Sequence, residues 1–166
     1  MPDCTPDLKL RVILLIQLLN FNKEFAKRLK IAPEHISDTV LASMNKANKK
    51  AFEDFLKEYE RVNQKQNTKK PLVPYFVVAH PGTTEKDMAD LKEFCRKNRL
   101  FINLTQVFTP TPGTMSTAMY YSGKDPKTKK EMIVPRAFRE KKDQKNMLLT
   151  KGRAEILDKI RKNKSN

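Results

Sequence analysis

An apolar run that ends at an abrupt corner constrains the fold of this chain more than any other segment. Residues 72–78 read Leu-Val-Pro-Tyr-Phe-Val-Val, and side chains of this kind favour a buried strand. The corner that follows, residues 79–84, reads Ala-His-Pro-Gly-Thr-Thr. Pro81 ends the strand by removing a hydrogen-bond donor, and Gly82 permits backbone angles that other residues avoid. Such a corner lies at the carboxyl edge of a parallel sheet, where α/β proteins bind ligands.

A helix is predicted to begin directly after this corner, near Glu85. Thr83 or Thr84 offers a hydroxyl that can cap the first turn, and Asp87 completes a loose capping box with Thr84. The apolar residues that follow recur at helical spacing and share one face, which we expect to be buried. They are Met88, Leu91, Phe94 and Cys95.

Two further strands that end at corners are predicted, one on each side of the first in the sequence. Residues 29–32 form a short strand that ends at Pro33-Glu34-His35, and residues 101–108 form a strand that ends at residues 109–114. Helices separate the three strands, so the order is βαβαβ, and right-handed crossovers then give a parallel sheet. All three corners then lie on one edge of that sheet, where their polar side chains are expected to converge.

The remaining helices follow from apolar periodicity. Residues 8–28 are apolar on nearly all sides at first and amphipathic later. Ser37 and Asp38 are good first residues for a short helix that carries Val40, Leu41 and Met44 on one side. The clearest helix has five apolar residues in one stripe, which should be buried. They are Phe52, Phe55, Leu56, Tyr59 and Val62.

Composition divides the chain into three regions. We expect a helical lead-in at 1–28, an α/β domain at 29–123 and a basic C-terminal extension at 124–166. Within the extension, the segments predicted from the sequence pattern are a short edge strand at 132–135, a polar helix at 136–149 and a last helix at 153–162.

The positive charge is concentrated in the extension. The whole chain of 166 residues carries a formal charge of +15, and residues 124–166 hold 15 Lys and Arg against 6 Asp and Glu, which gives +9. A region of this kind could contact nucleic acid or an acidic membrane surface. A solvated basic face that keeps the chain soluble explains the charge equally well.

Cysteine usage and hydropathy bear on localisation. Cys4 and Cys95 lie 91 positions apart and form no disulfide framework, so a reducing cytoplasm is the natural inference. The apolar segment Leu10–Leu19 spans only about ten residues, too few to cross a bilayer. We therefore expect a buried helix there and no membrane partner.

No self-sufficient catalytic motif is present. The sequence has no P-loop, GxGxxG, GxSxG or HExxH pattern. His35 and His80 could act together as proton-transfer groups or metal ligands, with Glu34 orienting one of them, but a histidine at a strand end is more often a structural, hydrogen-bonded residue. Cys95 shares the apolar face of its helix, where a free cysteine behaves as a small hydrophobic residue.

Three segments carry a family resemblance. Residues 31–44, which begin Ile-Ala-Pro-Glu-His-Ile-Ser-Asp, resemble the fourth barrel strand and following helix of radical S-adenosylmethionine proteins. Residues 73–84 resemble the next strand, where relatives often carry a Gly-x-Pro-Gly-Glu-Thr corner, and residues 108–121 resemble the strand after that. The chain is most similar to the YgiQ-type group of iron–sulfur oxidoreductases of unassigned reaction, from about Leu29 to Leu149.

The chain departs from this family in its cysteines. Radical enzymes of this type hold a [4Fe–4S] cluster with a Cys-x-x-x-Cys-x-x-Cys loop after the first strand. This chain has no such loop, and its two cysteines cannot supply three ligands. The resemblance therefore implies a half barrel, the C-terminal part of a larger protein, with the missing N-terminal half as its partner.

For the full-length protein, the resemblance implies S-adenosylmethionine and a [4Fe–4S] cluster, with reductive cleavage of the former and hydrogen abstraction from an unknown substrate. No cofactor, metal ligand or catalytic residue is assigned to this chain, which we expect to be inert alone. By position in the family pattern, six residues at the strand-end corners would face the pocket for S-adenosylmethionine and substrate. They are Glu34, His35, His80, Gly82, Thr83 and Pro110.

Two alternatives of other classes stay open. The extension at 124–166 could make the chain a nucleic-acid-binding module, for example for structured RNA. Phe138 is the only aromatic residue in that range, so stacking on single strands has little support there. The chain could also be a structural domain whose basic region docks onto a partner protein.

Overall fold

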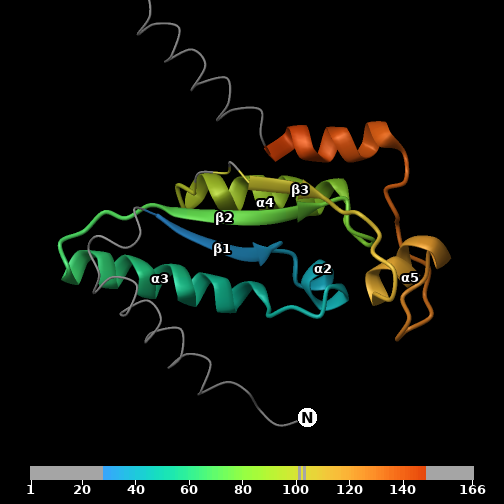
Figure 1. Ribbon diagram of the computed structural model, residues 1–166, viewed down its shortest axis with the longest axis horizontal. Coiled ribbons are helices and arrows are strands. Elements are labelled where there is room, and N and C mark those ends of the chain that lie inside the picture. Colours follow the sequence, from blue (N-terminus) through green and yellow to red (C-terminus); the bar gives the residue numbers. More distant parts are fainter. Residues whose placement is uncertain (1–27, 101, 103, 149–166) are drawn as a thin grey trace, which may run out of the picture. The chain divides into compact units, whose positions relative to one another are not determined.

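The computed structural model describes residues 28–100, 102 and 104–148 (Figure 1). The predicted helices at 8–28 and 153–162 lie outside these residues, apart from Arg28. Residues 138–148 form a helix near the end of the described chain. The other elements are β1 (Leu29–Glu34), α2 (Asp38–Ser43), α3 (Lys49–Lys65), β2 (Leu72–Val78), α4 (Glu85–Lys97), β3 (Leu104–Val107) and α5 (Met115–Ser122).

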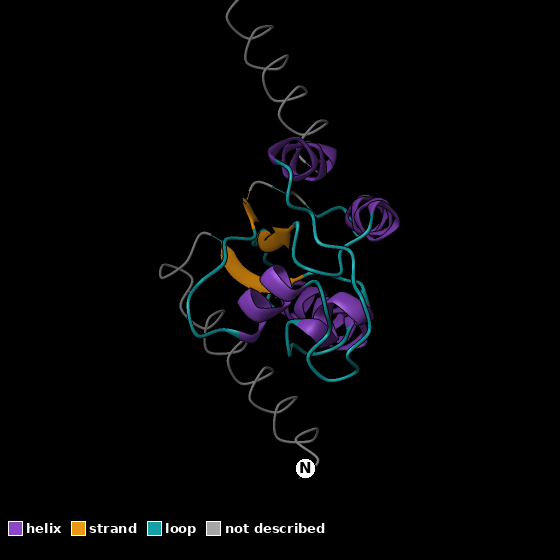
Figure 2. Cartoon of the chain, turned by 90° about the vertical axis from the view of Figure 1, so that its right-hand side faces the viewer, coloured by secondary structure: helices purple, strands orange, loops and turns teal. Residues whose placement is uncertain are grey.

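The three strands form an open parallel sheet in the order β1-β2-β3, with their arrows pointing the same way in Figure 1. They are seen closer to end-on in Figure 2, where strands are orange. Tyr75 lies opposite Leu104 and Val78 opposite Val107 in the ladder between β2 and β3. The predicted α/β class with three parallel strands is confirmed, and the open sheet is consistent with part of a barrel.

The central strand β2 provides the middle of the core. Phe76 and Val78 have no exposed surface, while Tyr75 and Val77, which alternate with them, are half-buried. This alternation of buried and half-buried residues is the pattern of a strand with one face fully covered. Buried residues of α2 and α4 belong to the same core. They are Val40, Leu41, Met88, Leu91, Phe94 and Cys95, which include the four predicted for α4.

The corner after β2 has the backbone geometry that its sequence predicts. Gly82 has a φ of 88°, in the left-handed region that glycine occupies without strain. Ala79 has a φ of 59°, which is uncommon for a residue with a Cβ. The predicted capping box is confirmed, because the Thr84 hydroxyl accepts from the Asp87 N–H and the Asp87 carboxylate accepts from the Thr84 N–H.

The structure divides into two compact units, which are described separately: one contains residues 50–72, and the other contains residues 30–49 and 73–148. In the first unit, Tyr59 and Val62 of α3 are buried, with Phe55 and Leu72 packed against them. The Tyr59 hydroxyl donates to the carbonyl of Lys70 at 3.2 Å. Of the predicted stripe of α3, Phe52, Tyr59 and Val62 are buried, whereas Phe55 and Leu56 are half-buried.

The extension forms a short turn before its helix. Lys124 and Glu131 make an isolated antiparallel bridge, and the Met132 N–H donates to the carbonyl of Gly123 at 2.9 Å. The strand predicted at 132–135 is wrong, since these residues adopt no regular structure. Pro135 lacks an N–H for a ladder, and Ile133 is 62% exposed.

The polar helix predicted at 136–149 is observed at 138–148, where Gln144 and Leu148 are buried. In the described part of the chain, no helix is both long enough and apolar enough to cross a membrane.

The capping box should contribute measurably to stability. We expect Thr84→Ala to lower the free energy of unfolding by about 1 kcal/mol, because one N–H of the first turn of α4 loses its acceptor. Thr84→Ser keeps the hydroxyl and is the matched control. Urea denaturation followed by circular dichroism measures both variants. Equal stability of the alanine and serine variants would show that the cap does not stabilise the helix.

Candidate functional site

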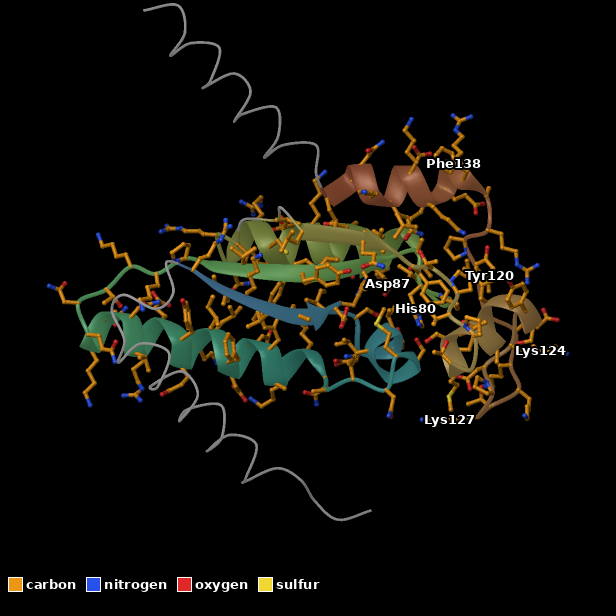
Figure 3. The ribbon with its side chains drawn as sticks, viewed as in Figure 1. His80, Asp87, Tyr120, Lys124, Lys127 and Phe138 are labelled. Atoms are coloured by element: carbon orange, nitrogen blue, oxygen red, sulfur yellow. The ribbon has the colours of Figure 1, made fainter. Side chains whose placement is uncertain are left out.

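His80 joins the corner after β2 to three other segments of its unit (Figure 3). Its Nε2 lies 2.8 Å from the Ser116 Oγ of α5, and its Nδ1 lies 2.8 Å from the Pro81 carbonyl oxygen. The Ser43 hydroxyl of α2 lies 3.4 Å from the same Nδ1. The ring of Phe108, at the end of β3, meets the imidazole edge-on with centroids 5.0 Å apart.

These contacts fix the tautomer of His80. A carbonyl oxygen only accepts hydrogen bonds, so the proton resides on Nδ1 and is donated to Pro81. In the neutral ring Nε2 is then an acceptor, and the Ser116 hydroxyl donates to it. Burial lowers the pKa of His80, although the hydrogen bond to Pro81 acts in the opposite direction. His80 is thus a neutral, fully bonded imidazole near pH 7.

His35 is also buried, but only one of its nitrogens is bonded. Its Nδ1 accepts the Ser37 N–H at 3.0 Å, so in the neutral ring the proton lies on Nε2. This Nε2 has no hydrogen-bond partner among the described residues, and the side chain has no exposed surface. Burial lowers the pKa of His35 to about 4, opposed by the negative charge of Asp87 and reinforced by His80.

Thr83 is the second residue with an unpartnered buried group. The side chain has no exposed surface, and its Oγ1 has no partner among the described residues. Its backbone N–H is satisfied by the His80 carbonyl at 3.0 Å. An unpaired buried polar atom costs free energy, so each such atom in a native protein calls for a physical reason. Of the three such atoms among the described residues, two belong to successive strand-end corners, those after β1 and β2, and the third is Thr105 Oγ1 within β3.

Asp87 connects the capping box to His35. Burial alone would raise the pKa of this carboxyl, but hydrogen bonds from Ser37 and Thr84 outweigh burial and hold the pKa below its usual value. The carboxylate therefore stays charged and acts on His35. Figure 3 labels Asp87 and His80, both at the carboxyl end of the sheet.

Glu34 and Pro110 are placed differently. The Glu34 carboxylate pairs with the Lys46 ammonium at 3.4 Å, and neither histidine is among its recorded hydrogen-bond or ion-pair partners. Its φ of 65° turns the chain sharply at the end of β1. Pro110 is half-buried in the third corner. Of the six residues expected to converge, His35, His80 and Thr83 are therefore the buried group.

Residues of the extension accept hydrogen bonds from two backbone N–H groups at the corner after β2. The Gly82 N–H donates to the Ile133 carbonyl at 2.7 Å, and the Ala79 N–H donates to the buried Gln144 Oε1 at 2.9 Å. A Cβ added at Gly82 would lie 3.2 Å from the Met132 side chain, so the approach is close. The predicted ligand-facing corner is thus held from one side by the extension.

The sequence did not single out Ser43, Ser116 or Gln144. Each is a common polar residue in a helix, and its partner lies 36 to 65 positions away in the chain. No local pattern distinguishes such a contact from a solvent-exposed side chain.

The thiol of Cys95 is buried, and burial raises its pKa to about 12, so it is protonated near neutral pH. The described residues contain no group of three or more His, Cys, Asp and Glu that could hold a metal ion.

The buried neutral state of His35 should make stability depend on pH. The unfolded chain takes up this proton near the ordinary pKa of 6.5, whereas the folded chain does so only near 4. The contribution of neutral His35 to the free energy of unfolding is therefore fully present above about pH 6.5 and falls as the pH drops towards 4. For wild type, we expect a loss of about 2 kcal/mol from this group between about pH 7 and pH 5.

His35→Asn tests this dependence, because the asparagine carbonyl can still accept the Ser37 N–H but cannot titrate. Urea denaturation at both pH values should show a pH dependence smaller by about 2 kcal/mol in the variant. Burial of His80 contributes in the same direction to both proteins and cancels in the comparison. An unchanged pH dependence would contradict the assignment.

The bond between the corner and the extension can be tested with Gln144→Leu. The variant leaves the buried Ala79 N–H without an acceptor, which should cost about 1–3 kcal/mol of unfolding free energy. Amide hydrogen exchange at Ala79 should also become faster. Lys142→Leu, an exposed position on the same helix, is the control. If exchange at Ala79 is equally slow in both variants, the bond does not hold the corner.

Comparisons with known proteins find similarity over most of this chain. The profile of a domain of unknown function, DUF3362, matches residues 103–157. A UPF0313 protein of Methanocaldococcus jannaschii is 42% identical over 135 residues, which cover 78% of this chain and 22% of that protein.

Two further UPF0313 proteins show the same relation. That of Bacteroides thetaiotaomicron is 38% identical over 148 residues (80% of this chain, 24% of that protein), and that of Geobacter sulfurreducens is 40% identical over 136 residues (80% and 22%). UPF0313 is the YgiQ-type group that the sequence resembles. The chain spans less than a quarter of the length of these relatives.

Proposed function

We propose that this chain, homologous over most of its length to part of the UPF0313 proteins, is part of a radical S-adenosylmethionine protein. Its three parallel strands would form one side of the site for S-adenosylmethionine and for a substrate of unassigned class. The homology and the open parallel sheet support this reading. The observation that carries it is the pair of buried, unpartnered polar groups, His35 Nε2 and Thr83 Oγ1, at successive strand ends.

These two groups fit a polar ligand. In its neutral form His35 presents an N–H donor, and Thr83 presents a hydroxyl that can donate or accept. S-adenosylmethionine carries a carboxylate, ribose hydroxyls and ring nitrogens that could take up these bonds. Neither side chain has exposed surface, so a ligand would reach these groups only when the corners open, and a bond made there would then meet little competition from water. Removing either group should therefore weaken binding noticeably.

A [4Fe–4S] cluster does not fit this chain. Three thiolate ligands are needed, whereas the sequence holds two cysteines, and burial raises the pKa of the Cys95 thiol to about 12. In the proposed protein the cluster would be held by cysteines outside this sequence. Bound S-adenosylmethionine would supply a carbon radical after reductive cleavage. The residues of this chain would bind and orient it and exclude water, and no catalytic step is assigned to them.

The remaining corner residues have positioning roles in this proposal. His80 would hold the β2 corner against α5, since its Nε2 accepts the Ser116 hydroxyl. Gly82 would allow close approach of the backbone, and Glu34 and Pro110 would shape the neighbouring corners. Each of these proposed roles follows from the position of the residue at the end of its strand.

Ligand binding to the isolated chain tests the proposal directly. We expect added S-adenosylmethionine to shift the amide resonances of residues 34–35, 80 and 82–84 in two-dimensional NMR spectra of the labelled chain. Thr83→Val, which keeps the shape but removes the hydroxyl, should weaken the titration by about tenfold. Thr128→Val, at an exposed threonine of the turn after Asp125, is the matched control and should titrate as wild type.

Two results would contradict the proposal. One is a titration in which the shifts lie away from the three corners or in which Thr83→Val binds as well as Thr128→Val. The other is a stable iron–sulfur cluster with turnover after reconstitution of this chain with iron and sulfide, which would mean that no further cysteines are needed.

A further inference from the structure

We propose that the end of α5 and the extension at 124–148 form a binding surface for single-stranded nucleic acid. Two exposed aromatic rings, Tyr121 and Phe138, would stack on bases, and the surrounding lysines and arginines would contact phosphates. The inference is independent of the S-adenosylmethionine site, because it uses none of the residues at the strand-end corners.

Arg136 joins the extension to the end of α5. Its Nη2 donates to the carbonyl oxygens of Tyr120 and Tyr121 at 2.9 and 3.0 Å, which are acceptors left open by the end of the helix. Lys141 adds a second link, with its Nζ 3.1 Å from the Tyr120 hydroxyl and 4.9 Å from the centre of that ring. Tyr121 therefore belongs to the same surface as residues 136–141, although it lies outside the basic extension in the sequence.

Tyr121 and Phe138 are the most exposed large apolar residues among those described, at 72% and 81%. Tyr121 packs edge-on against Tyr120, with centroids 5.4 Å apart, so its ring is supported from within the protein while most of its surface faces solvent. A supported ring of this kind is a ready platform for a base, because every base has a flat apolar face. Figure 3 shows Phe138 at the start of the last described helix.

The charge of this surface suits a phosphate backbone. Residues 124–148 contain nine Lys and Arg against four Asp and Glu. Among the described residues, no carboxylate lies within 4 Å of the ammonium groups of Lys124, Lys129 or Lys130. Asp125 holds the turn that carries these lysines, since its Oδ1 accepts the N–H groups of Lys127 and Thr128.

A hollow of about 350 Å³ lies on the same surface, between the end of α5 and the turn. Lys124 and Arg136 are among its lining residues, together with Gly123 and Met132. Cations beside exposed rings favour a single strand over a duplex, because in a duplex the base faces are stacked on one another and unavailable.

Fluorescence anisotropy with labelled oligonucleotides tests the inference on the 166-residue chain. We expect an unstructured RNA strand to bind more tightly than a duplex of the same sequence. If four phosphates are contacted, affinity should fall by about 50-fold between about 50 and 200 mM salt. A DNA strand of the same sequence shows whether the surface distinguishes RNA from DNA. Equal affinity indicates contacts to bases and phosphates alone, and a preference for RNA indicates contacts to the 2′-hydroxyl.

Matched variants separate stacking from charge. Tyr121→Ala and Phe138→Ala should each weaken single-strand binding by about tenfold, whereas Tyr121→Phe and the exposed control Met115→Ala should not. The pair Lys124→Gln and Lys129→Gln should lower the salt slope by about 1.4. Lys86→Gln with Lys92→Gln, on α4, removes the same charge and should leave the slope unchanged. Circular dichroism confirms that each variant is folded.

The inference is overturned if the aromatic variants bind single strands as well as wild type does, or if duplex binds more tightly than single strand. It is also overturned if both lysine pairs change the salt slope equally, since the effect of charge would then not be specific to this surface. Binding to acidic lipid vesicles without binding to oligonucleotides would assign the surface to a membrane instead and would equally reject it.

Discussion

The hydrogen bonds of the buried His80 imidazole are the interaction on which the rest of this structure depends. One ring nitrogen donates to the neighbouring Pro81 carbonyl and the other accepts from Ser116, so a single side chain joins the end of the central strand to α5. Phe108 packs against the ring from the end of β3. Because burial keeps the pKa of His80 low, the ring needs no counter-ion near neutral pH. The carboxyl edge of the sheet is therefore organised by a neutral group.

The extension completes the same corner from outside the sheet. Ile133 and Gln144 accept the N–H groups of Gly82 and Ala79, two donors that an abrupt strand end leaves without ladder partners. The composition of the extension indicates a solvated basic tail. Part of it is nevertheless hydrogen-bonded to the β2 corner, while other residues of it are exposed cations. Three buried polar atoms remain without a partner among the described residues: His35 Nε2 and Thr83 Oγ1 at the strand-end corners, and Thr105 Oγ1 within β3.

The local elements were predictable because their causes are local. The run at 72–78, the corner at 79–84 and the Thr84–Asp87 capping box all follow from neighbouring residues, and each is confirmed. The strand predicted at 132–135 failed because β-propensity cannot reveal that the Ile133 carbonyl bonds to Gly82 in another segment.

The site itself was predictable only in outline. The positions of His35, His80 and Thr83 at strand ends follow from the sequence, whereas their burial and their bonding depend on long-range packing. The aromatic character of the basic surface was missed for the same reason. Phe138 is the only ring within the extension, and only the bonds from Arg136 show that Tyr121 belongs with it.

The order of the strands in the sheet is the same as their order in the sequence. A doubly wound sheet reverses direction at a topological switch point, and its ligand crevice opens where the two halves diverge. Successive strands that always add on the same side have no such reversal. The corners that end β1, β2 and β3 therefore follow one another along one edge of the sheet in their sequence order, so a ligand bound along that edge would contact them in that order.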